Sequence, residues 1–260
     1  MAVAILGTAT VACASDTSDT SAAPAPTAAA PATSVPPTAV PATAVPATTV
    51  PSTAASEADD AAEAADGELI WEQVSFGFVS AYVLARGNEL AVVDTGLAGN
   101  GAKIGEAIGM LGGNLDDLDH VILTHLHADH VGSLPELLDA APGAVAYAGE
   151  ADIAGIISPR AITAVNDGDD IFGLQVVGTP GHTAGHICLY DEAASLLIAG
   201  DALIESSGVV EGPSPQFTAD MDAATASAQA LAALQFENLA VGHGSPIRGG
   251  ASDKVAAGVG

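Results

Sequence analysis

The chain has 260 residues and a formal net charge of −27, because 32 Asp and Glu face only 5 Lys and Arg. Phosphate contacts require basic side chains, so this composition excludes nucleic acid as a partner. Polyanionic substrates would be repelled as well, unless they bind a metal directly. The expected partner is therefore a small-molecule substrate.

The first 13 residues form a short apolar run that ends in Cys13. The run is too short to span a bilayer but is typical of a secretion signal. Its end, Thr10-Val11-Ala12-Cys13, resembles a bacterial lipoprotein cleavage site. This predicts an extracytoplasmic protein, either secreted or lipid-anchored through Cys13 to the outer face of the cell membrane. An unprocessed N-terminus is the alternative.

Residues 14–66 are almost entirely Ala, Pro, Thr, Ser and Val, and contain the near-repeat Ala-Val-Pro-Ala-Thr. Such a segment cannot bury enough apolar surface to offset its ordering entropy, so it is expected to be a disordered linker. It would tether a domain to the membrane, or would be a tail without an anchoring role. Residues 67–260 have a globular composition and are long enough for one catalytic domain.

Within residues 67–260 the apolar pattern alternates between strands and helices. Strands are predicted over 69–73, 81–85, 90–94 and 118–124, with a helix over 101–111 between the last two. A helix over 133–139, a strand over 144–147 and a short helix from Glu150 follow. The remaining elements are strands over 171–177, 186–190, 195–198 and 239–241, and an Ala-rich helix over 222–234.

The loop between the strand over 118–124 and the helix over 133–139 contains His125, His127, Asp129 and His130. Neutral His and ionised Asp are poor core residues unless they are paired, and both are ligands for first-row metals. The loop therefore predicts a metal site, with a solvated His-rich loop as the alternative. Three later strand ends also carry ligand-type residues, namely His182, Asp201 and His243.

These motifs, together with Val93-Asp94-Thr95-Gly96 upstream, resemble in their order the metallo-β-lactamase-fold hydrolases, over roughly residues 68–248. The resemblance implies an α/β fold, a four-layer αββα sandwich. It also implies two divalent metal ions, expected to be zinc, with iron or manganese as alternatives. His125, His127 and His182 would hold one ion, and Asp129, His130 and His243 the other. Asp201 would bridge them, Asp129 would orient the nucleophile or pass on its proton, and Asp94 would brace the loop.

The activity that the resemblance implies is hydrolysis of a carboxylic ester, lactone or thioester by a hydroxide shared between the two metals. Asp201 occupies a position where true metallo-β-lactamases usually carry Cys or Ser. Glyoxalase-II-type thioesterases share the ligand set but append a basic glutathione-binding region, whereas only Arg248 and Lys254 are basic after His243. Acyl-homoserine lactonases share the set too. The alternatives are a di-iron redox or oxygen-handling protein, a β-lactamase-like amide hydrolase and a non-catalytic metal-binding module.

Three further residues are expected to be structural or inert. Cys188 lies between Ile187 and Leu189 in an apolar strand, which predicts a buried, unreactive thiol. His120 is expected to be structural. His186 is expected to be structural or on the surface, with a role behind the metal ligands as the alternative.

Overall fold

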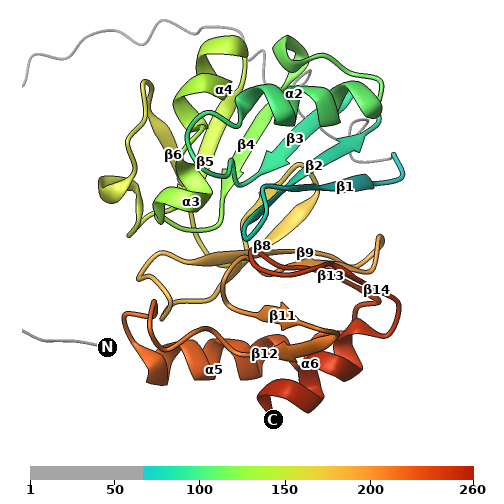
Figure 1. Cartoon of the computed structure of the whole chain (residues 1–260), viewed down its shortest axis with the longest axis vertical. Coiled ribbons are helices and arrows are strands. Elements are labelled where there is room, and N and C mark those ends of the chain that lie inside the picture. Colours follow the sequence, from blue (N-terminus) through green and yellow to red (C-terminus); the bar gives the residue numbers. More distant parts are fainter. Residues whose placement is uncertain (1–66) are drawn as a thin grey trace, which may run out of the picture. The chain divides into compact units, whose positions relative to one another are not determined.

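Two β-sheets face each other, and helices cover the outer face of each sheet (Figure 1). The structure is a computed structural model that describes residues 67–260. The predicted signal segment (1–13), the linker (14–66) and the anchor at Cys13 lie outside these residues and stay predictions.

The first sheet has the strand order β1-β2-β3-β4-β5-β6. Its strands are β1 (Ile70–Ser75), β2 (Ser80–Arg86), β3 (Glu89–Val93), β4 (His120–Leu123), β5 (Val145–Gly149) and β6 (Ile162–Val165). Strands β1 to β3 pair antiparallel, and β3 to β6 pair parallel. The connecting helices are α2 (Gly101–Met110), η1 (Leu115–Asp117), α3 (Ala128–Val131), α4 (Leu134–Ala140) and η2 (Ile153–Gly155).

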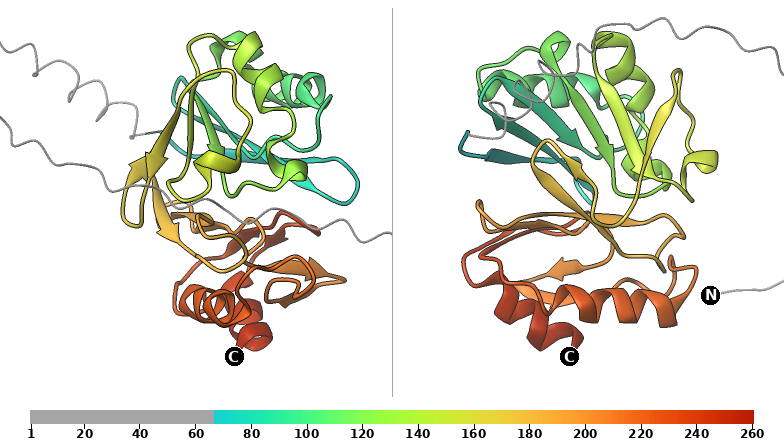
Figure 2. Two further views of the ribbon diagram at one scale, coloured as in Figure 1. Left: turned by 90° about the vertical axis from the view of Figure 1, so that its left-hand side faces the viewer. Right: turned by 180° about the vertical axis from the view of Figure 1, so that it is seen from behind.

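The second sheet has the strand order β14-β13-β10-β9-β8-β7. Its strands are β7 (Asp170–Ile171), β8 (Leu174–Gly178), β9 (Ile187–Asp191), β10 (Leu196–Ile198), β13 (Asn238–Ala240) and β14 (Ile247–Arg248). Only β10 and β13 pair parallel. Helices α5 (Met221–Leu231) and α6 (Ala251–Val259) and the hairpin of β11 (Ile204–Ser206) and β12 (Val209–Glu211) complete this half, as Figure 2 shows from two sides.

The layers follow from the period of two along buried strands. In β2, Val83 packs toward the core beneath α2 and α4, whereas Leu84 packs into the core between the sheets. In β10, Ile198 faces the core between the sheets and Leu197 faces the core beneath α5 and α6. Three apolar cores therefore separate four layers, which confirms the predicted αββα sandwich.

The structure differs from the predicted elements in several places. The strand expected over 171–177 is the hairpin β7–β8, because Phe172 and Gly173 have φ values of 59° and 72° and reverse the chain. The helix expected from Glu150 is a turn followed by η2. The elements that were not predicted are the strands β6, β11, β12 and β14 and the helices η1, α3 and α6. Over residues 67–260, no helix combines the length and the apolar character needed to cross a membrane.

A buried ion pair links the two sheets. The Arg86 guanidinium on β2 donates hydrogen bonds to the Asp191 carboxylate at the end of β9 and, at 2.8 Å, to the Phe172 carbonyl. Arg86 is 5% exposed and Asp191 is 4% exposed. Removing one partner would leave a buried charge without its counterion, which costs far more than losing a surface pair.

Asp191→Ala is therefore expected to lower the free energy of unfolding by about 3–5 kcal/mol in urea denaturation. The control is Glu72→Ala, which removes the exposed partner of Arg248 at 3.6 Å. This control is expected to change stability by less than about 1 kcal/mol. Equal effects of the two substitutions would contradict the structural role given to the buried pair.

Candidate metal centre

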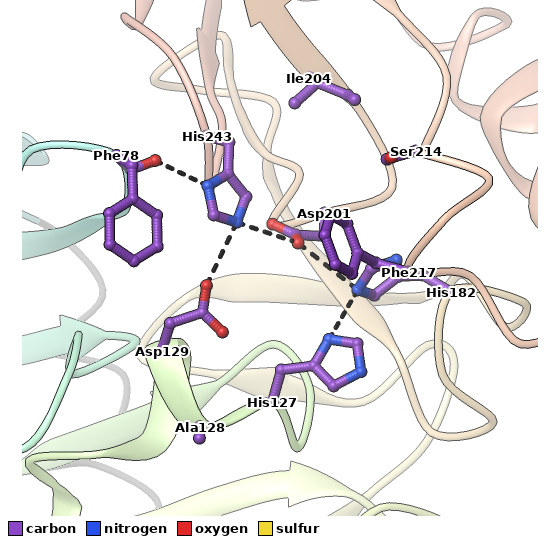
Figure 3. Close-up of a pocket in the computed structure, with 10 residues that line it drawn as sticks. All are labelled: Phe78, His127, Ala128, Asp129, His182, Asp201, Ile204, Ser214, Phe217 and His243. Carbon is purple, nitrogen blue, oxygen red and sulfur yellow. Dashed lines mark hydrogen bonds and ion pairs between the residues drawn. The ribbon is translucent and has the colours of Figure 1, made fainter. Parts of the chain in front are cut away.

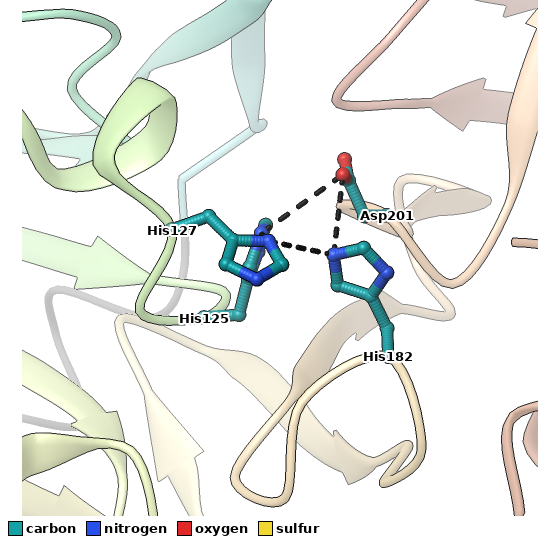
Figure 4. Close-up of side chains that lie close together, drawn as sticks. All are labelled: His125, His127, His182 and Asp201. Atoms are coloured by element: carbon teal, nitrogen blue, oxygen red, sulfur yellow. Dashed lines mark hydrogen bonds and ion pairs between the residues drawn. The ribbon is translucent and has the colours of Figure 1, made fainter. Parts of the chain in front are cut away.

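The structure brings all seven predicted site residues together at one edge of the molecule, where strands of both sheets end. Two groups of side chains form there, within which the candidate ligand atoms all lie within 4.8 Å of one another. Figure 4 shows the group that contains Asp201, and Figure 3 shows Asp129 and His243 of the other. The groups are His125, His127, His182 and Asp201, and Asp129, His130 and His243. Carboxyl ends of neighbouring parallel strands meet at one edge, which is why loops distant in sequence converge.

The first group has the spacing of a tetrahedral metal site. The Nδ1 atom of His127 lies 3.0 Å from Nε2 of His125 and 2.9 Å from Nε2 of His182. Oδ2 of Asp201 is 3.4 Å from Nε2 of His182 and 3.9 Å from Nε2 of His125. Tetrahedral zinc with bonds of about 2.0–2.1 Å to nitrogen places its ligand atoms roughly 3.4 Å apart. These four donors therefore fit one ion.

The second group shares Asp201 with the first. Nε2 of His243 lies 3.4 Å from Nε2 of His130 and 3.5 Å from Oδ2 of Asp129. Asp201 reaches this group with Oδ1, 3.3 Å from Nε2 of His130, and with Oδ2, 3.3 Å from Nε2 of His243. Among the described residues, the buried Oδ1 of Asp201 has no hydrogen-bond partner. The donor set and this unpaired oxygen fit two cations with a carboxylate between them.

Hydrogen bonds from Asp94 and Thr124 fix two of the imidazoles. Thr124 Oγ1 donates to Asp94 at 2.8 Å and so accepts from Nδ1–H of His125 at 3.0 Å. The Nδ1–H group of His130 donates to Asp94 at 2.8 Å, and the same carboxylate accepts from the Thr124 N–H. Both rings therefore direct Nε2 toward the centre, as metal-binding imidazoles do when Nδ1–H is paired. The prediction that Asp94 braces the loop is confirmed.

Two of the other three imidazoles, those of His243 and His182, are fixed by partners that the sequence did not reveal. Nδ1–H of His243 donates to the Phe78 carbonyl at 2.6 Å. Thr218 donates to the Ser214 carbonyl and so accepts from Nδ1–H of His182 at 3.3 Å. Neither Phe78 nor Thr218 belongs to a motif, so only the folded chain identifies them.

His186 is buried, 1% exposed, and holds the backbone of Asp201. The Asp201 N–H donates to its Nε2 at 3.1 Å, and its Nδ1 lies 2.7 Å from Thr179 Oγ1. Burial lowers the pKa of His186 to about 3, so the ring is neutral at pH 7 and can accept this hydrogen bond. His186 thus supports the candidate ligand Asp201 from behind, which was the alternative for this residue, and the expected surface position is wrong.

The two groups differ in charge before a metal binds. Burial lowers the pKa of His182 to about 4 and that of His125 well below its usual value, so both rings offer lone pairs at pH 7. Burial also lowers the pKa of His130, but the charge and hydrogen bond of Asp94 outweigh it and raise that pKa to about 9. A cation entering the second group must therefore displace a proton from His130.

Asp201 itself is held ionised. Burial alone would raise its pKa, but the hydrogen bond with His243 and the charges of the neighbouring imidazoles hold that pKa well below the usual range. An ionised, buried carboxylate between two groups of nitrogen donors is suited to divalent cations.

The Gly-His motif at residues 242–243 requires a glycine, because there is no space for a side chain at position 242. A Cβ atom there would collide with Oδ1 of Asp201 and lie 2.7 Å from Cε1 of His130. Any side chain at this position would displace a candidate ligand from each of the two groups.

Asp152 is a site residue that the sequence analysis missed. It is buried, and its carboxylate accepts from the Leu126 N–H at 3.0 Å and from the Gly185 N–H at 2.7 Å. It thus ties the loop of His125 and His127 to the loop of His182. A signal was present, because Asp152 follows β5, the parallel neighbour of β4, at the same edge of the sheet.

Asp152→Asn is expected to weaken metal binding about 10- to 100-fold, because the amide puts a donor where the carboxylate accepts from two loops. The measurement is zinc titration of the metal-free protein against a chromophoric chelator. Asp119→Asn is the control, since Asp119 also accepts a main-chain N–H, from Leu90, but precedes β4 at the opposite end from the site. Equal affinity of Asp152→Asn and the unsubstituted protein would refute the positioning role.

Cys188 lies outside both groups, and the prediction of a buried thiol is confirmed. Burial raises its pKa to about 12. A Cys13→Ser variant, in which Cys188 is the remaining cysteine, is therefore expected not to react with Ellman's reagent at pH 8 until urea unfolds it. Rapid labelling of the folded protein would contradict this expectation.

Comparison with known proteins bears on the fold and on the site. A protein-family model described as the Metallo-beta-lactamase superfamily matches residues 74–243. Uncharacterized protein YobT of Bacillus subtilis (strain 168) is 32% identical over 214 residues, which cover 70% of this chain and 91% of YobT. The hydroxyacylglutathione hydrolase of Photorhabdus laumondii is 40% identical over 89 residues, 33% of each chain. That of Acidiphilium cryptum is 36% identical over 166 residues, 61% of each chain.

The chain thus spans between one third and about three fifths of these two hydrolases. Among solved structures, the metallo-beta-lactamase family protein TTHA1429 of Thermus thermophilus has a TM-score of 0.59 and 24% identity, covering 73% of this chain and 77% of that one. TTHA1623 in a di-iron-bound form has a TM-score of 0.57 and 25% identity, covering 69% and 94%. Because the family model, the fold and the paired His/Asp clusters agree, the chain belongs to the metallo-β-lactamase superfamily and is a metal-dependent hydrolase.

Proposed function

We propose that the protein hydrolyses a carboxylic ester, a lactone or a thioester of a small molecule at a two-metal centre. The observation that carries the proposal is the placement of Asp201, which lies 3.3–3.4 Å from imidazole nitrogens of both groups. A carboxylate in this position can be shared by two cations, and two-metal sites of this kind activate water for hydrolysis.

A cavity of about 620 Å³ gives a small molecule access to this centre. Its lining includes candidate ligands from both groups, His127, His182, Asp201, Asp129 and His243 (Figure 3). A cavity of this size is within the range of small-molecule sites, and it places a bound substrate directly against the proposed metal ligands.

In the proposed site, His125, His127 and His182 would hold one ion, Asp129, His130 and His243 would hold the other, and the Asp201 carboxylate would be available to both. Two bound ions would supply Lewis acidity, which can lower the pKa of water to about 7 and polarise the carbonyl oxygen of a substrate. Asp129 lines the cavity with a side chain that is 27% exposed. Its carboxylate can orient the attacking water, take its proton and deliver that proton to the leaving group.

Phe78 and His243 form one wall of the cavity. The Phe78 ring stacks on the His243 ring with the centroids 6.0 Å apart, and the Phe78 carbonyl accepts the Nδ1–H of the same imidazole. The β1–β2 turn therefore keeps Nε2 of His243 aimed at the centre.

Two of the comparisons support particular forms of the proposal. The similarity to hydroxyacylglutathione hydrolases favours a thioester, although the matched part is 33–61% of those proteins. The di-iron-bound form of TTHA1623 favours iron as the alternative to zinc, and with it the second candidate function, a di-iron redox protein. The His/Asp donors themselves suit either metal.

Metal analysis and an activity panel separate these functions. The purified full-length protein would be assayed for bound metals and for turnover of 4-nitrophenyl acetate, a γ-lactone, an S-acetyl thioester and a chromogenic β-lactam. Two zinc ions with turnover of the ester, lactone or thioester support the proposal. Iron with redox-sensitive absorption bands and no turnover would favour the redox function, and turnover of the β-lactam alone would favour an amide hydrolase.

Asp201→Asn is expected to lower kcat by at least about 100-fold, since even residues behind the ligands affect activity 10- to 100-fold. Chelation of the unsubstituted protein should abolish turnover, and added zinc should restore it. The control is Asp116→Asn, which removes a carboxylate from the exposed helix η1 and should leave kcat unchanged. Full activity of Asp201→Asn would refute the bridging role.

A further inference from the structure

We infer that the substrate carries an apolar, uncharged group, which the cavity above the metal centre binds. This inference rests on the proposed function and narrows its substrate class. Two features of the molecule carry it, namely the side chains that line the cavity beside the candidate ligands and the positions of the five basic residues of the chain.

The part of the cavity that is not made of candidate metal ligands is mainly hydrocarbon. It consists of Phe78, Ala128, Ile204, Ser214 and Phe217 (Figure 3). Phe78 is 59% exposed and Phe217 is 61% exposed, which is unusual for side chains of this size. An apolar group placed between these rings and Ile204 would remove hydrocarbon from water on both sides of the contact.

No Lys or Arg side chain lines this cavity, and each one is engaged elsewhere. Arg86 pairs with Asp191, Arg160 donates to the carbonyls of Leu138 and Ala141, and Lys254 donates to the Gly208 carbonyl. Lys103 lies over the Phe76 ring, and Arg248 lies 3.7 Å from the centre of the Trp71 ring. These five are all the Lys and Arg residues of the chain, so no Lys or Arg is left to face the cavity.

The charges nearest the apolar wall in sequence are acidic. Glu205 follows Ile204, and Asp220 lies three residues after Phe217. A carboxylate on a substrate arm that extends along this wall would lose water without gaining a partner, because the wall offers hydrocarbon and no Lys or Arg. The cavity therefore selects against an anionic arm and for a hydrocarbon arm of the same length.

The test compares 4-nitrophenyl esters that differ only in the acyl arm, with the zinc-loaded full-length protein. The series is acetate, butyrate and hexanoate, and the matched anionic probe is the mono-4-nitrophenyl ester of adipic acid, in which a carboxylate replaces the terminal methyl of hexanoate. Each buried methylene is worth about a fourfold gain in kcat/KM. Hexanoate is therefore expected to exceed acetate by at least about tenfold, and adipate to be at least about tenfold below hexanoate.

Two substitutions at one position test the wall itself. Phe217→Ala removes an aromatic face and should lower the ratio of hexanoate to acetate kcat/KM about fivefold. Phe217→Lys places a cation on the wall and should raise adipate relative to hexanoate. Met110→Ala is the control, because Met110 is 77% exposed on α2 and is not part of the cavity, so both ratios should stay unchanged.

The outcomes separate this inference from the function on which it rests. Turnover of acetate with no gain along the series, or with adipate equal to hexanoate, overturns the inference and leaves the hydrolase in place. If the protein turns over no ester of this series and neither the lactone nor the thioester of the panel above, both the inference and the proposed function are overturned. A length-dependent gain that Phe217→Ala reduces and Met110→Ala does not supports the inference.

Discussion

The centre depends on one constraint, which is that imidazoles and carboxylates must approach within hydrogen-bond distance at a place with little water. Nitrogen atoms of His125 and His182 both lie within 3.0 Å of the same nitrogen of His127, and Asp201 stands between the two groups. Such a cluster is unfavourable in a metal-free core, because burial penalises the charged forms and lone pairs facing one another repel. A bound divalent cation would attract the lone pairs and the carboxylate that otherwise face one another, so the same geometry becomes favourable.

Much of the rest of the structure keeps the cluster in this state. Asp94 is a non-glycine residue at a φ of 60°, a conformation that Asp tolerates better than most residues. In that conformation its carboxylate accepts from both Thr124 and His130. The local strain is thus offset by hydrogen bonds that orient two imidazoles, and the motif Val93-Asp94-Thr95-Gly96 has a physical reason to lie upstream of the loop.

The sequence predicted the parts of the molecule that depend on local pattern. Most of the central strands, helix α5 and the ligand-type residues at strand ends were predicted, because period, composition and motif order are local properties. The family resemblance supplied the four-layer arrangement. The β7–β8 hairpin was read as one strand because the positive φ of Phe172 leaves no signal in composition. Helix α6 was missed because its apolar stripe consists mainly of Ala and Val between glycines.

Contacts made through backbone atoms could not be predicted at all. His243 is oriented by the carbonyl of Phe78, and any residue type offers a carbonyl at that position. The same holds for Asp152, which accepts hydrogen bonds from the main-chain N–H groups of Leu126 and Gly185. Every residue except proline offers such an N–H group, so the sequence can point only to the carboxylate. Sequence motifs identify the side chains that would bind a metal. Only the tertiary fold shows which groups form the hydrogen bonds that orient those side chains.

The scarcity of basic residues links the fold to the chemistry. The buried Arg86 and the stacked Arg248 both stabilise the packing of strands, so the positive charges of this acidic chain are already committed to structure. A metal centre is then the one place where the protein can offer concentrated positive charge to a substrate. In the proposed reaction the metal ions would bind the carbonyl group, and hydrocarbon side chains would contact the rest of the substrate. Neither interaction requires a further basic residue.

Because each group draws ligands from both sheets, the site also requires that the sheets keep their register. His125 follows β4 of the first sheet, and Asp201 follows β10 of the second. Next to the site, the Tyr82 hydroxyl on β2 donates to the Val241 carbonyl at 2.8 Å and accepts the Val241 N–H at 3.0 Å. The Ile187 N–H donates to the Thr124 carbonyl at 2.9 Å. A small slip of one sheet over the other would break these bonds before it separated the ligands, so the hydrogen bonds beside the centre set its dimensions.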